Sequence, residues 1–386
     1  EDSYIDCPTR ERGMYARDGI IQYFNNLAFF GDHSLMKRFL TLFANDPASD
    51  GRMKAVCPTS ADYVINDFAL NLMDGFYAYY VNTGDQTFIK ENWNAILKNM
   101  QWFDKLSNTN ASGLLSLNFL GKRTKGYYGG FHGDLSPTDK HMCKTGFSCA
   151  FTCFYICAIR AVKFLADAID DSKIALEYSK RIKKVSKNAQ KYFWDKKRNC
   201  FSDDFDHTTH SVQANSLAVL ADIPSEKQLP GIREHLDETL NFFFINGYDA
   251  SNGVLFSPSF AFYIFEALYK LGMIERVEDL MVKGWGSMLS KGLKTCREYF
   301  ERHHDSFCHA WSAHPAYFLS KNILGVTYPD APDFNKVRIN VQSSSVKWAE
   351  GTYPHPKGVI HVKWHFDKNG KRIFRIKAPK CVKIDI

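Results

Sequence analysis

The 386-residue chain has 45% hydrophobic and 24% charged residues, a globular composition that excludes disordered, collagen-like and coiled-coil proteins. Its formal net charge of +7 comes from residues 346–386, where eight Lys and two Arg face Glu350, Asp367 and Asp385. The first 345 residues are therefore near neutral, which argues against a nucleic-acid groove. The longest apolar stretch, residues 147–159, ends at Arg160, and we expect no membrane span because it is too short to cross a bilayer.

Helical spacing of apolar residues dominates from residue 18 to residue 323. Residues 173–195 place apolar side chains at intervals of three and four, as an outer amphipathic helix does, whereas residues 147–168 are apolar nearly all round, as an enclosed helix is. Helices of both kinds predict two concentric layers. Eleven helices are expected, near residues 18–30, 33–45, 64–81, 86–106, 145–169, 173–194, 210–221, 231–243, 258–271, 274–290 and 309–323. This odd number fits a mainly α fold, an (α/α)6 barrel of six hairpins whose first helix is missing.

Start and stop signals support these helix limits. Ser257 and Pro258 fit an N-cap and a first helical position, and Gly272 fits the residue just past a helix C-terminus. Residues 82–85, Asn-Thr-Gly-Asp, form a break between two long apolar runs. The local signals therefore agree with the periodicity.

The periodicity changes after residues 329–332, Pro-Asp-Ala-Pro, which form a plausible linker. Apolar residues then alternate, as in Ile360, Val362, Trp364 and Phe366, and Asn369-Gly370 predicts a type I′ hairpin turn. We expect a catalytic barrel over residues 1–326 and a small antiparallel β-sandwich over residues 327–386. The Lys-rich face of this second domain is interpreted as solvated strand surface.

Cysteine and histidine spacing does not predict a metal site. Cys149, Cys153 and Cys157 span about 12 Å along one helix and cannot all bind one ion, so we interpret them as a packing stripe. His207 and His210 are close in sequence but have no third ligand. We therefore expect no metal and no organic cofactor.

Two polar clusters could carry chemistry. The first is Asp6-Cys-Pro-Thr-Arg10-Glu11-Arg12 with Asp18, and the second joins Arg297-Glu298 to His303-His304-Asp305 and His309-Ala-Trp311. A purely structural alternative for the first cluster is an N-cap at Asp6 surrounded by surface ion pairs. Two acids far apart in sequence on loops of a helical toroid suggest glycoside hydrolysis, which needs one protonated carboxyl and one carboxylate.

The motif at residues 6–12, with Tyr15 and Asp18 behind it, resembles the signature of the bacterial α-L-rhamnosidase family of inverting six-hairpin glycoside hydrolases. The resemblance continues through further segments, which cover most of the chain in order: residues 67–68 with 80–85, 210–215, 285–289, 292–298, and 309–312 with 323–325. It implies removal of terminal α-L-rhamnose from a carbohydrate substrate, and the near-neutral charge of the first 345 residues leads us to expect no nucleic-acid partner. The oligomeric state and the compartment stay open.

By this resemblance Glu11 is the general acid and Glu298 the general base that activates water. The other implied site residues contact the substrate: Asp6, Arg10 and Asp18 hold rhamnose hydroxyls, Tyr15 takes the place of a family tryptophan, and His309 lines the pocket.

Elementary electrostatics adds two expectations. A nearby guanidinium favours the ionised form of a carboxyl, so the acid role requires Arg10 and Arg12 to turn away from Glu11, towards Asp6, Asp18 or backbone carbonyls. Inversion requires the two carboxyl groups to stand roughly 6.5 to 9.5 Å apart, with a water between them.

The sequence departs from the family pattern at three aromatic positions. Arg297 stands where the family has Trp before the base, and Asn71 and Leu135 stand where tryptophans are expected; Tyr127, Tyr128 or Phe131 could compensate. The alternatives to a rhamnosidase are a non-catalytic carbohydrate-binding or scaffold protein derived from this fold, another six-hairpin glycosidase, and a uronate lyase.

Overall fold

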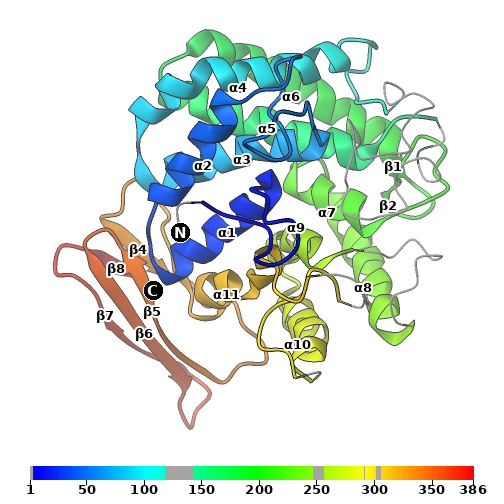
Figure 1. Cartoon of the computed structure of the whole chain (residues 1–386). Helices are drawn as coiled ribbons and strands as arrows, with labels where there is room; N and C mark the ends of the chain where they lie inside the picture. Colours follow the sequence, from blue (N-terminus) through cyan, green and yellow to red (C-terminus); the bar gives the residue numbers. More distant parts are fainter. Residues whose placement is uncertain (1–2, 118–142, 144, 247–255, 291, 301–305) are drawn as a thin grey trace.

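Helices make up most of the chain up to residue 323 in the computed structural model (Figure 1). The structure describes residues 3–117, 143, 145–246, 256–290, 292–300 and 306–386. The longer helices follow one another in this order: α1 (Ala16–Phe29), α2 (Ser34–Asn45), α3 (Asn66–Thr83), α4 (Gln86–Ser107), α5 (Cys149–Ala168), α6 (Ser172–Phe193), α7 (Val212–Leu220), α8 (Leu229–Asn246), α9 (Pro258–Lys270) and α10 (Ile274–Ser290). Each of these ten lies over a stretch where a helix was predicted.

The predicted capping residues act as expected. The Ser257 hydroxyl accepts a hydrogen bond from the Phe260 amide at 3.2 Å, Pro258 occupies the first position of α9, and Gly272 follows the helix at φ +75°. Between α3 and α4, Gly84 adopts φ +69° and Asp85 caps α4 by accepting from the Phe88 amide at 3.0 Å. Capping satisfies amides that lack a partner inside the helix, which is why these signals mark the helix ends well.

The helices fall into the two predicted classes. The odd-numbered helices α1, α3, α5, α7 and α9 contact one another in chain order, and α1 also contacts α9. All five contribute lining residues to one central cavity. The even-numbered helix α6 instead buries a single face, made of Ala175, Tyr178, Val185, Ala189 and Phe193. Apolar side chains all round a helix therefore correspond to a central position, and a single apolar stripe corresponds to the periphery.

The apolar part of α5 extends beyond residues 147–159, the stretch that the sequence analysis judged too short. Its 20 residues are enough, by length and composition alone, to cross a membrane, so the prediction that the segment is too short was wrong. However, 78% of its apolar window is buried inside the protein. Cys149 and Cys153 lie in this buried part, as the packing interpretation predicted, with their sulfur atoms 3.9 Å apart.

The predicted helix over residues 309–323 is divided into three pieces. A 3-10 turn (Ala310–Ala313), α11 (Pro315–Phe318) and a π turn (Leu319–Ile323) replace it. Pro315 lacks an amide proton, so a regular helix cannot run through it from His309. The 3-10 turn still packs against α1 and α9.

The C-terminal segment forms two three-stranded sheets. One joins β3 (Val326–Thr327), β4 (Lys336–Ile339) and β8 (Lys383–Asp385), and the other joins β5 (Trp348–His355), β6 (Gly358–Phe366) and β7 (Arg372–Lys377). Ile360, Val362 and Trp364 are buried as predicted, whereas Phe366 is exposed. The Trp364 indole donates to the Ile323 carbonyl at 2.9 Å, which ties this segment to the helices. The short strands β1 (Trp194–Asp195) and β2 (Cys200–Phe201) form a separate hairpin.

Two details of this segment differ from the prediction. Strands β4 and β8 pair in parallel, because the chain passes through the whole β5–β7 sheet before it returns. The β6–β7 hairpin has a longer loop than a type I′ turn, since Gly370 has φ +75° while Asn369 keeps a negative φ. The Gly370 amide instead donates to the Asp367 carbonyl at 3.1 Å, which is typical of a type I turn followed by a left-handed glycine.

Candidate active site

The segment before α1 is folded back on itself by Asp6. The Asp6 amide donates to the Gly13 carbonyl at 2.9 Å, and the Asp6 carboxylate accepts from the Gly13 amide at 2.7 Å. Because α1 begins only at Ala16, the alternative in which Asp6 caps a helix is wrong. The closed loop projects Arg10 and Glu11 outward, with 40% and 43% of their side chains exposed.

The segment that carries Glu298 and His309 lies against this loop. The Ala310 amide donates to the Asp6 carbonyl at 3.3 Å, and the His309 amide donates to the Cys296 carbonyl at 2.8 Å. Figure 1 shows the blue N-terminal segment meeting the yellow to orange segment that follows α10. Residues almost three hundred positions apart therefore share one site.

Arg10 joins the two candidate catalytic carboxyl groups. Its Nη2 lies 3.2 Å from Glu11 Oε1 and 2.7 Å from Glu298 Oε2. The prediction that Arg10 turns away from Glu11 was wrong, because the buried carboxylate of Glu298 draws the guanidinium across the loop. The two contacted oxygens are at most roughly 6 Å apart, which is below the range expected for inversion.

Glu298 is buried, whereas Glu11 is exposed. The Glu298 side chain is only 7% exposed, and its Oε2 accepts from the Ser306 amide at 3.1 Å. The Glu298 carbonyl also accepts from the Trp311 indole at 3.2 Å. Glu11 has a hydrogen bond with the Tyr15 hydroxyl, and burial together with the Glu11 carboxylate raises the pKa of Tyr15, so that Tyr15 stays protonated.

His309 lies between Asp6 and Asp18. Its Nε2 is 3.9 Å from Asp6 Oδ2, its Nδ1 is 3.4 Å from Asp18 Oδ1, and its ring packs on Trp311 with centroids 4.3 Å apart. Burial, with Arg10 nearby, lowers the pKa of His309 to about 3. The imidazole is therefore neutral at the pH at which proteins usually work.

We call the seven predicted site residues the site cluster; its members are Asp6, Arg10, Glu11, Tyr15, Asp18, Glu298 and His309. The contacts above link all seven. Sequence reasoning missed Ser306, whose backbone amide gives no residue-specific signal, and it did not assign a role to Trp311, although that residue stands in the quoted 309–312 motif. His303, His304 and Asp305 lie outside the described residues.

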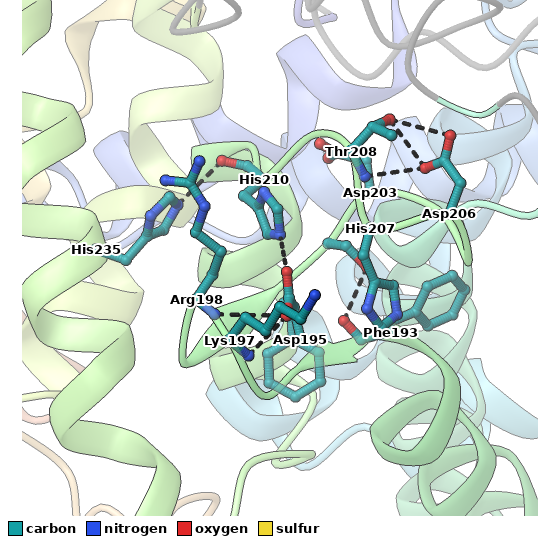
Figure 2. Close-up of polar contacts among 12 residues, drawn as sticks. Phe193, Asp195, Lys197, Arg198, Asp203, Asp206, His207, Thr208, His210 and His235 are labelled. Carbon is teal, nitrogen blue, oxygen red and sulfur yellow. Dashed lines mark hydrogen bonds and ion pairs between the residues drawn. The ribbon is translucent and has the colours of Figure 1, made fainter.

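His207 and His210, which are close in sequence, have different hydrogen-bond partners. Figure 2 shows His210, whose Nε2 lies 2.9 Å from Asp195, while His235 contacts the His210 carbonyl at 3.0 Å. His207 instead contacts the Tyr192 carbonyl at 2.9 Å. No group of three His, Cys, Asp or Glu suited to a metal ion occurs among the described parts of the chain.

Comparison with known proteins identifies the family of the chain. A family model described as the bacterial alpha-L-rhamnosidase six-hairpin glycosidase domain matches residues 1–323. The chain belongs to this family. No curated protein sequence matches it.

Solved structures of rhamnosidases resemble the chain over most of its length. The crystal structure of a GH78 family rhamnosidase of Bacillus sp. GL1 has a TM-score of 0.83 and 25% identity, and the match covers 100% of this chain and 40% of that one. A rhamnosidase from Klebsiella oxytoca with rhamnose bound has a TM-score of 0.67 and 21% identity, and the match covers 82% of this chain and 59% of that one. The Streptomyces avermitilis α-L-rhamnosidase complexed with L-rhamnose has a TM-score of 0.77 and 15% identity, and the match covers 98% of this chain and 35% of that one. The present chain thus spans less than two thirds of each rhamnosidase.

The structure explains one of the three departures from the family pattern. Asn71, which stands where a tryptophan is expected, accepts hydrogen bonds from Arg17 Nε at 3.0 Å and Arg17 Nη2 at 2.9 Å. Arg17 is fully buried and pairs with Asp67 at 2.5 Å. Arg297 packs over the Phe307 ring, with its guanidinium carbon 5.0 Å from the centroid. Leu135, Tyr127, Tyr128 and Phe131 lie outside the described residues.

Proposed function

We propose that this chain is the catalytic part of an exo-acting glycoside hydrolase that removes terminal α-L-rhamnose. The observation that carries the proposal is the shared contact of Glu11 and Glu298 with Arg10 Nη2, at 3.2 and 2.7 Å. Family membership supports the substrate class, and the rhamnose named with two of the similar structures supports it further. The proposal includes closure of the helices into an (α/α)6 barrel over residues 1–326, followed by a β-sandwich domain.

In the proposed reaction the carboxyl group of Glu11 donates its proton to the glycosidic oxygen as the bond from that oxygen to C1 breaks. The carboxylate of Glu298 removes a proton from a water molecule whose oxygen attacks C1 from the opposite face. The products are the free alcohol and rhamnose of inverted anomeric configuration. Burial of Glu298 suits a base that must be held in one position, and exposure of Glu11 suits an acid that meets a leaving group.

Arg10 has to leave Glu11 for this chemistry, since a cation in contact with a carboxyl opposes its protonation. We propose that substrate hydroxyl groups draw Arg10 away, with Asp6, Asp18 and the neutral His309 as the other hydroxyl-binding groups. The same movement would separate the two carboxyls and admit the nucleophilic water. Tyr15, a hydrogen-bond donor beside Glu11, would orient that side chain.

The charge of the site cluster supports hydrolysis rather than the lyase alternative. Four carboxyl groups, those of Asp6, Glu11, Asp18 and Glu298, face the one guanidinium of Arg10, because His309 is neutral. A uronate lyase needs a positive pocket for its acidic sugar, whereas a neutral deoxy sugar is bound by carboxylates that accept hydrogen bonds from its hydroxyl groups.

The test is hydrolysis of 4-nitrophenyl α-L-rhamnoside by the purified chain, with the first-formed sugar anomer followed by proton NMR. We expect release of β-L-rhamnose before mutarotation. Release of the α anomer would contradict the inverting mechanism but not the hydrolase activity. Absence of hydrolysis, together with calorimetric binding of rhamnose, would favour the non-catalytic alternative.

A further inference from the structure

A cavity of about 570 Å³ lies inside the helices at the end away from the site cluster. Ile20, Phe24 and Leu27, which follow Asp18 along α1, line one side of it, and Tyr328 and Tyr353 from the C-terminal segment close it. None of the site cluster lines the cavity. Its size is that of a pocket for a small molecule.

Arg17 closes the cavity on the side of the site cluster. Its guanidinium carbon lies 5.4 Å from the ring centroid of Phe154 and 5.7 Å from that of Tyr263, and both rings line the cavity. Because Arg17 and Asp67 are fully buried and paired, they form a fixed barrier. The cavity is therefore a second site rather than an extension of the first.

The charged residues of the cavity do not balance. Lys321 pairs with both oxygens of Glu266, at 2.7 and 3.0 Å, so these two charges cancel. Asp74 receives one long hydrogen bond from Asn71, at 3.4 Å. No Lys, Arg or His of the described residues forms an ion pair with Asp74, and the lining is left with one uncompensated carboxyl group.

Aromatic rings line the same cavity as this carboxyl group. Tyr77, Phe154, Tyr263 and Tyr317 are among the lining residues, and the face of an aromatic ring attracts cations. Two protein cations already use these rings, because Lys321 Nζ lies 5.2 Å from the centroid of Tyr317 and Arg17 packs as described above. The cavity thus combines apolar rings with an acceptor for one positive charge.

We propose that this cavity binds a small organic cation, an ammonium group that carries apolar substituents, with Asp74 as its counter-ion and aromatic rings around it. This proposal goes beyond rhamnoside hydrolysis and does not depend on it. The ligand class follows from the charge and the rings together: an apolar neutral molecule would leave the Asp74 carboxylate without a counter-ion, and an anion would be repelled by its charge.

Binding should depend on pH through Asp74. Burial raises the pKa of Asp74 to about 7, although the hydrogen bond from Asn71 and the charge of Arg17 lower it. The other titratable or charged groups near it come from its own helix and from the elements packed around the cavity: Tyr77, Cys157, Arg160, Glu266 and Lys321. Since a bound cation favours the ionised form of Asp74, affinity for a permanent cation should fall as the pH drops through 7.

The experiment compares choline with its uncharged carbon isostere, 3,3-dimethylbutan-1-ol, by saturation-transfer NMR and calorimetry on the full chain at pH 8. We expect choline to bind at least tenfold more tightly than the isostere. The Asp74→Asn variant should lose at least tenfold in choline affinity, and the control Asp167→Asn, which alters an exposed carboxyl of α5, should bind as the parent does. Equal affinity for the two probes, or unchanged choline binding by Asp74→Asn, would overturn the proposal.

A second variant covers the case in which Asp74→Asn is poorly folded. Val81 lines the cavity on α3, and Val81→Trp should fill part of the space and abolish choline binding while Asp74 stays in place. Rhamnoside hydrolysis by both variants should match the parent, because no residue of the site cluster is changed. Full choline binding by Val81→Trp would place the ligand elsewhere and contradict the proposal.

Discussion

The buried ion pair of Arg17 and Asp67 allows a prediction whose magnitude follows from its surroundings. Both side chains are fully buried, their contact is 2.5 Å, and Asn71 and Phe68 complete the environment of the guanidinium. Asp67→Leu leaves the buried Arg17 charge without its carboxylate, and loss of one partner of a buried ion pair costs roughly 3 to 5 kcal/mol. For a chain of 386 residues this corresponds to a fall in Tm of about 4 to 6 °C.

The control is the double variant Arg17→Met with Asp67→Leu, which removes both charges and leaves apolar side chains of similar volume. Scanning calorimetry should show that the double variant recovers most of the loss, because neither charge of the Arg17–Asp67 pair remains buried without the other. If Asp67→Leu unfolds at the same temperature as the parent, then leaving Arg17 without Asp67 does not cost the stability predicted above. A double variant that is less stable than the single one would contradict the reasoning in the same way.

Three further predictions follow from other contacts. Glu278 accepts hydrogen bonds from hydroxyls and amides of residues 343–345. Although burial opposes the shift, these hydrogen bonds lower the pKa of Glu278 below the usual 4.5. Thermal melts should show that Glu278→Gln is less stable than the parent at pH 7, and that the difference in stability becomes smaller as the pH falls below 4.5. Ser257→Ala removes the α9 cap and should cost about 1 kcal/mol in urea unfolding, while an equal loss from the exposed Ser290→Ala would show that capping is not the cause. Arg10→Lys removes the planar guanidinium whose Nη2 contacts both carboxyls, so kcat/KM on a rhamnoside should fall about tenfold or more. An unchanged value would remove Arg10 from the site.

The sequence predicted the helices well where local chemistry decides their limits. Caps such as Ser257 and Asp85 act within one turn, and the contrast between α5 and α6 is visible in the apolar pattern alone. The division of residues 309–323 at Pro315 was also readable in principle, because proline interrupts a helix. The parallel pairing of β4 with β8 was not, since it depends on chain segments far apart in sequence.

Contacts between distant parts of the sequence also limited the prediction of the site. Family resemblance brought Glu11 and Glu298 together, but adjacency in sequence did not show where Arg10 points. That direction is decided by Glu298, which lies almost three hundred residues away and is visible only in three dimensions. The exchange of a tryptophan for Asn71 could be noticed in the sequence, whereas its partner Arg17 could not, because nothing in the local pattern links positions 17 and 71.

The division of roles between Glu11 and Glu298 is tested most directly by leaving-group dependence. The measurement is kcat/KM for the parent, Glu11→Gln and Glu298→Gln on methyl and 2,4-dinitrophenyl α-L-rhamnoside. A dinitrophenolate leaves without protonation, so Glu11→Gln should lose on the order of a hundredfold or more on the methyl glycoside and far less on the dinitrophenyl one, while Glu298→Gln should lose as much on both. Equal losses for Glu11→Gln on the two substrates, or full activity in either variant, would contradict the assignment.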